Sequence, residues 1–127
     1  MRNEILELSL EFAIEIVKYC ELLEEKRKFA ISNQLIRSGT SIWANVREAQ
    51  NPHSRADFVS KLTVAAKEAS ETEYWLLLCE KNESYPNPNE LMDSVKSIQK
   101  LLSKIISTSK KRLLYNGVTA SQYHNIK

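Results

Sequence analysis

Apolar residues recur at steps of three and four along most of this chain, the spacing that places them on one face of an α-helix. The pattern predicts four helices, over about residues 3–25, 28–49, 54–82 and 88–114. Four such helices are expected to pack their apolar faces around one shared core.

The chain also carries signals for where these helices stop and start. The Asn51–Pro52 pair ends the second helix, because the residue before a proline is pushed out of helical geometry. Ser54 is placed to cap the third helix, with Asp57 three residues further on. Residues 84–88 break the chain again, and Asn87 is placed to cap the fourth helix. Because the links are short, consecutive helices are expected to run antiparallel.

The predicted fold class is therefore all-α, an up-down-up-down four-helix bundle spanning residues 1–116. Residues 117–127 are expected to form a flexible C-terminal tail, with Gly117 as the stop of the fourth helix. The composition agrees, since 127 residues contain only two glycines and three prolines. An all-β fold needs many tight turns and therefore more of both residues. A glycine-rich phosphate loop is excluded for the same reason.

Few classes of active site fit this composition. The two cysteines, Cys20 and Cys79, lie in apolar helical patterns without neighbours at metal-ligand spacing, so buried thiols are expected. The two histidines, His53 and His124, fall in a predicted loop and in the tail. We therefore expect no metal, no cofactor and no histidine-activated nucleophile. The acidic N-terminal helix and the short apolar runs predict a cytoplasmic protein with no membrane contact.

Charge is unevenly distributed, although the net charge is only +2. Residues 3–25 carry seven glutamates and one lysine, whereas residues 84–127 carry seven bases and two acids. One interpretation is that acidic and basic helices pair along exposed seams. The other is that a row of lysines opposite the apolar face of the fourth helix follows a phosphate backbone. No aromatic residue interleaves with this row, so base stacking is not indicated. The row comprises Lys96, Lys100, Lys104 and Lys111.

A band of polar residues lies beside the apolar faces of the second and third helices. If its two strips meet, the Arg37 guanidinium can pair with the carboxylate of Glu68 or Glu71. The band is then a structural network or an oligomer interface. A small enzyme with Glu68 and Glu71 as an acid–base pair is the alternative, whereas a di-iron site is disfavoured because Glu-x-x-His pairs are absent. The band comprises Gln34, Arg37, Ser41, Asn45 and Glu48, with Lys61, Glu68 and Glu71.

Several strings in these helices resemble one bacterial protein family. They lie at residues 34–42, 44–49, 54–58 and 66–76. The combination of RS-x-TSI-x-AN-x-REA with KEA-x-ET-x-YWL is similar to that of the four-helix-bundle proteins first noticed as reading frames within intervening sequences of 23S ribosomal RNA genes. That family is related to the accessory variability determinant of diversity-generating retroelements. The resemblance covers about residues 3–115.

The resemblance implies a bundle without enzymatic activity that assembles into a homo-oligomeric ring, commonly a pentamer, around a central channel. For the retroelement relatives it implies a basic ring surface that binds nucleic acid and a partner reverse transcriptase. For the intervening-sequence branch it implies no established function. Carried over by position, the polar residues of the family signature look structural or interfacial rather than catalytic. They are Arg37, Ser38, Ser41, Asn45, Glu48, Lys67, Glu68, Glu71 and Thr72.

Two residues within the signature bear on how closely helices approach one another. Gly39 costs a helix about 1 kcal/mol relative to alanine, so we expect it to mark a close helix contact. Trp43 stands where the resembled family usually has a small residue, commonly glycine. Its indole is expected either to fill a subunit contact or to change the approach of two helices, which leaves the ring geometry open.

Two main hypotheses for function stay open beside the enzyme alternative. The leading one is a non-enzymatic homo-oligomer, a pentamer, that binds RNA or DNA through basic surfaces. The other is a protein-interaction scaffold or adaptor that binds a protein partner and no nucleic acid. Binding to nucleic acid weakens steeply as salt rises, so retention on RNA or DNA at different salt concentrations separates the two hypotheses.

Overall fold

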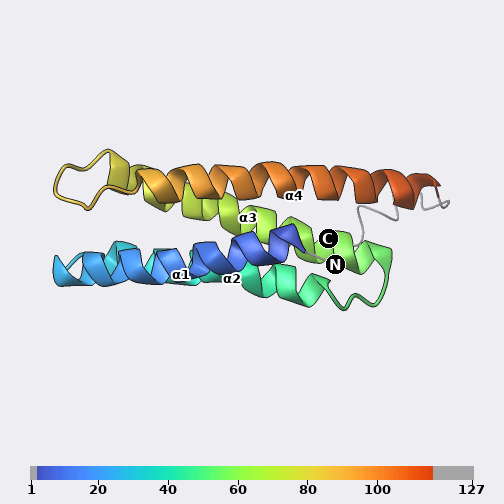
Figure 1. Ribbon diagram of the computed structural model, residues 1–127, viewed down its shortest axis with the longest axis horizontal. Helices are drawn as coiled ribbons and strands as arrows, with labels where there is room; N and C mark the ends of the chain where they lie inside the picture. The colour runs from blue at the N-terminus through green and yellow to red at the C-terminus, as the bar shows by residue number, and fades with distance from the viewer. Residues whose placement is uncertain (1–2, 116–127) are drawn as a thin grey trace.

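The computed structural model describes residues 3–115, which form four α-helices joined by short links (Figure 1). Helix α1 spans Glu4–Glu25, α2 Phe29–Ala49, α3 Arg55–Glu80 and α4 Asn89–Tyr115. Consecutive helices run antiparallel, and α1 also packs against α4 over a smaller interface. The described part of the chain is therefore an all-α bundle with the up-down-up-down order expected from the sequence.

The expected capping hydrogen bonds form, but α4 begins one residue later than predicted, because its first backbone bond runs from the Met92 N–H to the Pro88 carbonyl. The Ser54 hydroxyl accepts a hydrogen bond of 3.0 Å from the backbone N–H of Asp57 at the start of α3. The Asn87 side chain accepts one of 2.8 Å from the backbone N–H of Asn89 at the start of α4. The C-terminal tail expected at residues 117–127, and the helix stop at its first residue, lie outside the described residues.

The link between α1 and α2 reverses the chain without a glycine. Arg27 adopts a left-handed backbone conformation with φ of 62°, which a residue with a side chain takes only at some energetic cost. The backbone N–H of Lys28 donates to the carbonyl of Leu23 at 2.8 Å, and that of Arg27 donates to the carbonyl of Glu24 at 2.8 Å. This is the Schellman arrangement that commonly ends a helix, with arginine where glycine usually stands.

The core runs the length of the bundle and draws on all four helices. Ile16, Leu35, Leu76 and Leu102, one from each helix, are completely buried. Both cysteines are buried too, as expected, and burial raises the pKa of each thiol. Within residues 3–115 no helix is long and apolar enough to cross a lipid bilayer.

Gly39 marks a close approach of α1 and α2. A Cβ atom added at Gly39 would lie 2.9 Å from Cγ1 and 3.0 Å from Cγ2 of Ile16, closer than carbon atoms normally pack. Ile16 is fully buried and has little room to yield. The expectation that this glycine marks a close helix contact is confirmed.

Candidate nucleic-acid interface

The predicted lysine row lies on the outer face of α4. The opposite face of the same helix carries Val95, Ile98 and Leu102, which are buried in the core. All four lysines of the row are exposed, and none makes an ion pair with another residue of the described part of the chain. From first to last the row extends about 22 Å at 1.5 Å per helical residue. It is therefore a row of exposed positive charges without an ion-pair partner in the described part of the chain. Its members are Lys96, Lys100, Lys104 and Lys111.

The polar band is different, because its two strips meet across the α2–α3 interface. The Arg37 guanidinium donates to the carboxylates of Glu68, at 3.0 Å, and Glu71. The indole N–H of Trp75 also donates to Glu71, at 3.1 Å. The hydrogen bonds from Trp75 and Arg37 lower the pKa of Glu71, and its carboxylate raises the pKa of Arg37. The charges of Arg37, Glu68 and Glu71 are therefore paired with one another within the chain.

Two further contacts extend the same interface. The Ser38 and Thr72 hydroxyls are both buried and are joined by a hydrogen bond of 2.9 Å. Near the other end of the band, the Lys61 ammonium lies 3.1 Å from the carboxylate of Glu48, which raises the pKa of Lys61. The signature residues therefore join α2 to α3 through one buried hydrogen bond and exposed ion pairs.

Other members of the band do not cross to the neighbouring helix. The Ser41 hydroxyl donates to the carbonyl of Arg37 at 2.6 Å, and the Asn45 amide donates to the carbonyl of Ser41 at 2.9 Å. Gln34 of the band is exposed, and so is Lys67 of the family signature. These side chains bond to their own helix or face solvent, so they add nothing to the network around Arg37.

Trp43, which stands at a position where a small residue was expected, is half-buried on α2. Its indole N–H is covered by protein atoms and has no hydrogen-bond acceptor among the described residues. A buried donor without an acceptor destabilises a protein by about 1–3 kcal/mol. The packing of the Trp43 indole therefore has to offset the cost of this unpaired N–H.

A groove beside the lysine row was not found from the sequence. It has a volume of about 300 Å³ and lies between the N-terminal end of α3 and the C-terminal half of α4. At the end of the bundle where α3 begins, α4 extends beyond the first turn of α1 (Figure 1). The groove combines apolar and basic side chains, and Lys104 belongs both to it and to the row. Its lining is Arg55, Phe58, Leu101, Lys104, Ile105, Thr108, Ser109 and Arg112.

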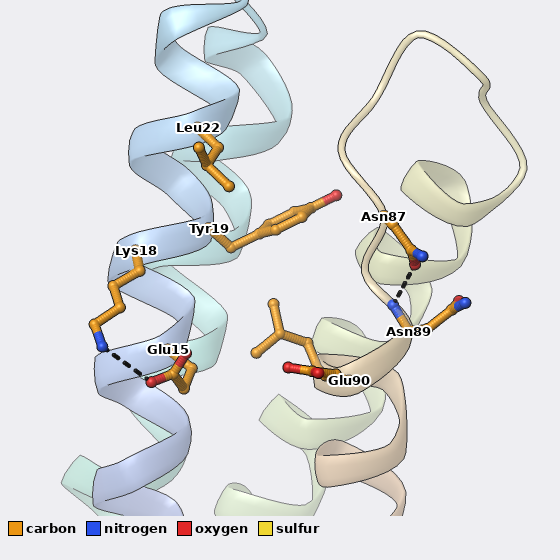
Figure 2. Close-up of a pocket in the computed structure, with 8 residues that line it drawn as sticks. Glu15, Lys18, Tyr19, Leu22, Asn87, Asn89 and Glu90 are labelled. Atoms are coloured by element: carbon orange, nitrogen blue, oxygen red, sulfur yellow. Dashed lines mark hydrogen bonds and ion pairs between the residues drawn. The ribbon is translucent and has the colours of Figure 1, made fainter.

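A second groove, of about 330 Å³, separates α1 from the start of α4 (Figure 2). Tyr19 points across it from α1, and its hydroxyl donates to the Pro86 carbonyl at 2.6 Å. Glu15 pairs with Lys18 along α1 at 3.2 Å, and Glu90 lies on the opposite wall. The two carboxylates make this groove unsuited to a polyanion.

Within residues 3–115 no group of three His, Cys, Asp or Glu is placed to hold a metal ion.

Known proteins match this chain both in sequence and in fold. The sequence model of a family described as 23S rRNA-intervening sequence protein matches residues 1–105, which include three of the four lysines in the row. A crystal structure of a protein of unknown function from the S23 ribosomal protein family of Bacteroides thetaiotaomicron VPI-5482 is 46% identical. That match covers 80% of this chain and 97% of the other, with a TM-score of 0.77. No curated protein sequence matches the chain.

Proposed function

Because this chain belongs to the family of 23S rRNA-intervening sequence proteins, we propose that it is a non-enzymatic homo-oligomer that binds RNA or DNA through the lysine row of α4. The observation that carries the proposal is the absence of any carboxylate partner for these lysines within residues 3–115. Cations of the polar band, by contrast, are neutralised by glutamates of the neighbouring helix. A strip left positive over about 22 Å attracts successive phosphates and releases their counterions.

The exposed surface of α1 supports self-association. Leu10, Ile14 and Val17 follow one another at steps of four and three and are 46%, 49% and 40% exposed. A row of apolar side chains in water marks an interaction surface, and a second copy of the chain is the partner we propose for it. The family resemblance favours a ring of five copies. A ring also repeats the lysine row, so several weak contacts with one nucleic acid add up to firm binding.

The polar band supports a role without catalysis. Glu68 and Glu71, the candidate acid–base pair, both accept hydrogen bonds from Arg37. The lowered pKa of Glu71 keeps its carboxylate ionised at neutral pH, and Arg37 occupies it. A general acid needs a raised pKa and a general base needs a free lone pair near substrate, so this pair suits architecture better. We place the protein in the cytoplasm, where RNA and DNA are accessible.

The test of binding is fluorescence anisotropy with labelled RNA and DNA at salt concentrations from about 50 to 200 mM. Reversing Lys96, Lys100 and Lys104 together to glutamate is expected to weaken binding more than 100-fold without changing the melting temperature. The matched control reverses three exposed lysines on other surfaces, Lys26, Lys67 and Lys81, for the same change in net charge. Unchanged binding after reversal of the row refutes the row as the contact surface. If both variants lose the same affinity, the loss comes from the change in net charge and not from the row.

Light scattering tests the assembly. Five copies of the 14.6 kDa chain would give a particle of about 73 kDa, whereas a mass near 15 kDa at low concentration refutes a homo-oligomer. Replacing Ile14 with aspartate should shift the mass toward the single chain while the helical circular dichroism stays. An assembly that shows no salt-sensitive retention on RNA or DNA would instead identify a protein-interaction scaffold.

A further inference from the structure

We propose that the groove between α3 and α4 holds one unpaired base of a single-stranded nucleic acid, which makes single strands the preferred ligand of the lysine row. We call it the Phe58 groove, after the aromatic residue in its wall. The inference rests on the proposed function, because Lys104 belongs both to the groove and to the row. It adds a preference that the row alone does not supply.

The apolar part of the groove is fixed in place. Phe58, Leu101 and Ile105 are half-buried and pack against the core, so their exposed surfaces belong to a rigid wall. The volume of about 300 Å³ is at the lower end of that of small-ligand sites. Nucleobases stack on aromatic rings, and such stacking is largely independent of base identity because every base has a π-face. The groove therefore offers Phe58 as a partner for one base.

The charges of the groove select an anionic ligand. Arg55, Lys104 and Arg112 line it, and no acidic residue does. The nearest acid along the chain, Asp57, accepts a hydrogen bond of 3.1 Å from the backbone N–H of His53 and is not part of the lining. Cations beside an aromatic residue match a nucleotide, whose base is apolar on its faces and whose phosphates are negative.

Continuity with the lysine row favours nucleic acid over an acidic peptide as the ligand. From Lys104 the row runs back along α4 to Lys96, so a chain of phosphates that leaves the groove meets further cations at four-residue steps. A duplex keeps its bases stacked and paired inside, whereas a single strand can turn a base outward. The groove therefore favours the single strand, while the row contacts either form.

The test compares Phe58→Leu with the unchanged protein by fluorescence anisotropy. Leucine keeps the groove apolar and leaves all three cations, so only the stacking surface is lost. We expect affinity for a labelled single-stranded DNA to fall about fivefold or more, the range for one lost base–aromatic stack, and affinity for a duplex to stay within about twofold. Phe58→Tyr should retain the affinity. Phe29→Leu, a change of the same kind at an exposed site on α2, is the matched control and should change neither.

A strand of equal length with a deoxyribose-phosphate backbone but no bases completes the design. The unchanged protein should bind it about as weakly as Phe58→Leu binds the normal strand, and Phe58→Leu should weaken it no further. Equal binding of strands with and without bases, or equal losses on single strand and duplex, overturns the groove and leaves the row intact. If poly-glutamate displaces the strand from the unchanged protein but not from Phe58→Leu, the result points to an acidic protein as the ligand of the groove. That result also overturns the proposed base site. Absence of binding to any nucleic acid refutes the proposed function itself.

Discussion

Arg37 on α2 and Lys100 on α4 are both cations on the outer sides of their helices, but their surroundings are opposite. Arg37 contacts two glutamates of α3, and the hydroxyls of Ser38 and Thr72 meet at the next residue of each helix, after Arg37 and after Glu71. Lys100 and its neighbours in the row contact no carboxylate of the described residues. Similar polar patterns in the sequences of two helices therefore have different surroundings in the fold. The Arg37 charge is paired with the neighbouring helix, whereas the lysine row of α4 leaves its charge facing solvent.

The largest effect that separates the two helices is expected at Gly39. Gly39→Ala adds a Cβ against Ile16, and such overpacking costs about 1–3 kcal/mol, of which the higher helix propensity of alanine returns about 1 kcal/mol. We expect a net loss of up to about 2 kcal/mol in the free energy of unfolding, measured by urea denaturation. Ser107→Ala, on the exposed face of α4, should change it by less than about 0.5 kcal/mol.

A second background shows whether contact with Ile16 is the cause. In Ile16→Ala the obstructing atoms are gone, so the same Gly39→Ala change should become neutral or stabilising. If Gly39→Ala is equally destabilising in both backgrounds, the close approach of α1 and α2 is not the reason for the glycine.

A smaller effect is expected at the buried hydroxyl pair between α2 and α3. Thr72→Val keeps the shape of the side chain but leaves the Ser38 hydroxyl buried without its partner, at a cost of about 1 kcal/mol. Adding Ser38→Ala removes the orphaned group, so the double variant should be less destabilised than the sum of the two single variants. Strict additivity in thermal melting would show that the two hydroxyls act independently.

The network around Arg37 should produce the smallest effect, visible in its dependence on pH. The hydrogen bonds from Trp75 and Arg37 lower the pKa of Glu71 below its ordinary value of 4.5, so its stabilising effect is present above pH 4.5 and is lost as pH falls through the lowered pKa. The difference in melting temperature between the unchanged protein and Glu71→Gln should therefore persist from pH 7 to about 5 and vanish in stronger acid. For Lys100→Gln, the matched change on α4, the difference should be near zero throughout. A Glu71→Gln difference that is independent of pH would contradict the ionic origin.

Local signals in the sequence were sufficient to predict the helices and their order. The cap at Ser54, the cap at Asn87 and the break at the Asn51–Pro52 pair each act on the few residues around them, so they could be recognised without the fold. Gly39 could also be interpreted, because a glycine inside a helix needs a reason. The fork of Arg37 onto Glu68 and Glu71 followed from two polar strips beside two packing faces.

The Phe58 groove could not be predicted from the fourth helix alone. Phe58 is far from Lys104 along the chain, and it reaches the row only because of the way α3 and α4 are rotated about their axes. The same holds for the bond from Tyr19 to Pro86, which joins α1 to the link before α4. Periodicity shows which face of a helix is buried, but it leaves open which residue of a distant helix lies opposite.

The order of packing in this bundle has a consequence for how the chain folds. Each helix meets its neighbour along the chain over a larger interface than α1 and α4 share. Most contacts therefore form between nearby parts of the chain, and folds with such local contacts cross their folding barrier quickly. The two helical hairpins can assemble before the α1–α4 seam closes. Helices α1 and α4 each have only one large interface, so their backbone amide hydrogens are expected to exchange before those of α2 and α3.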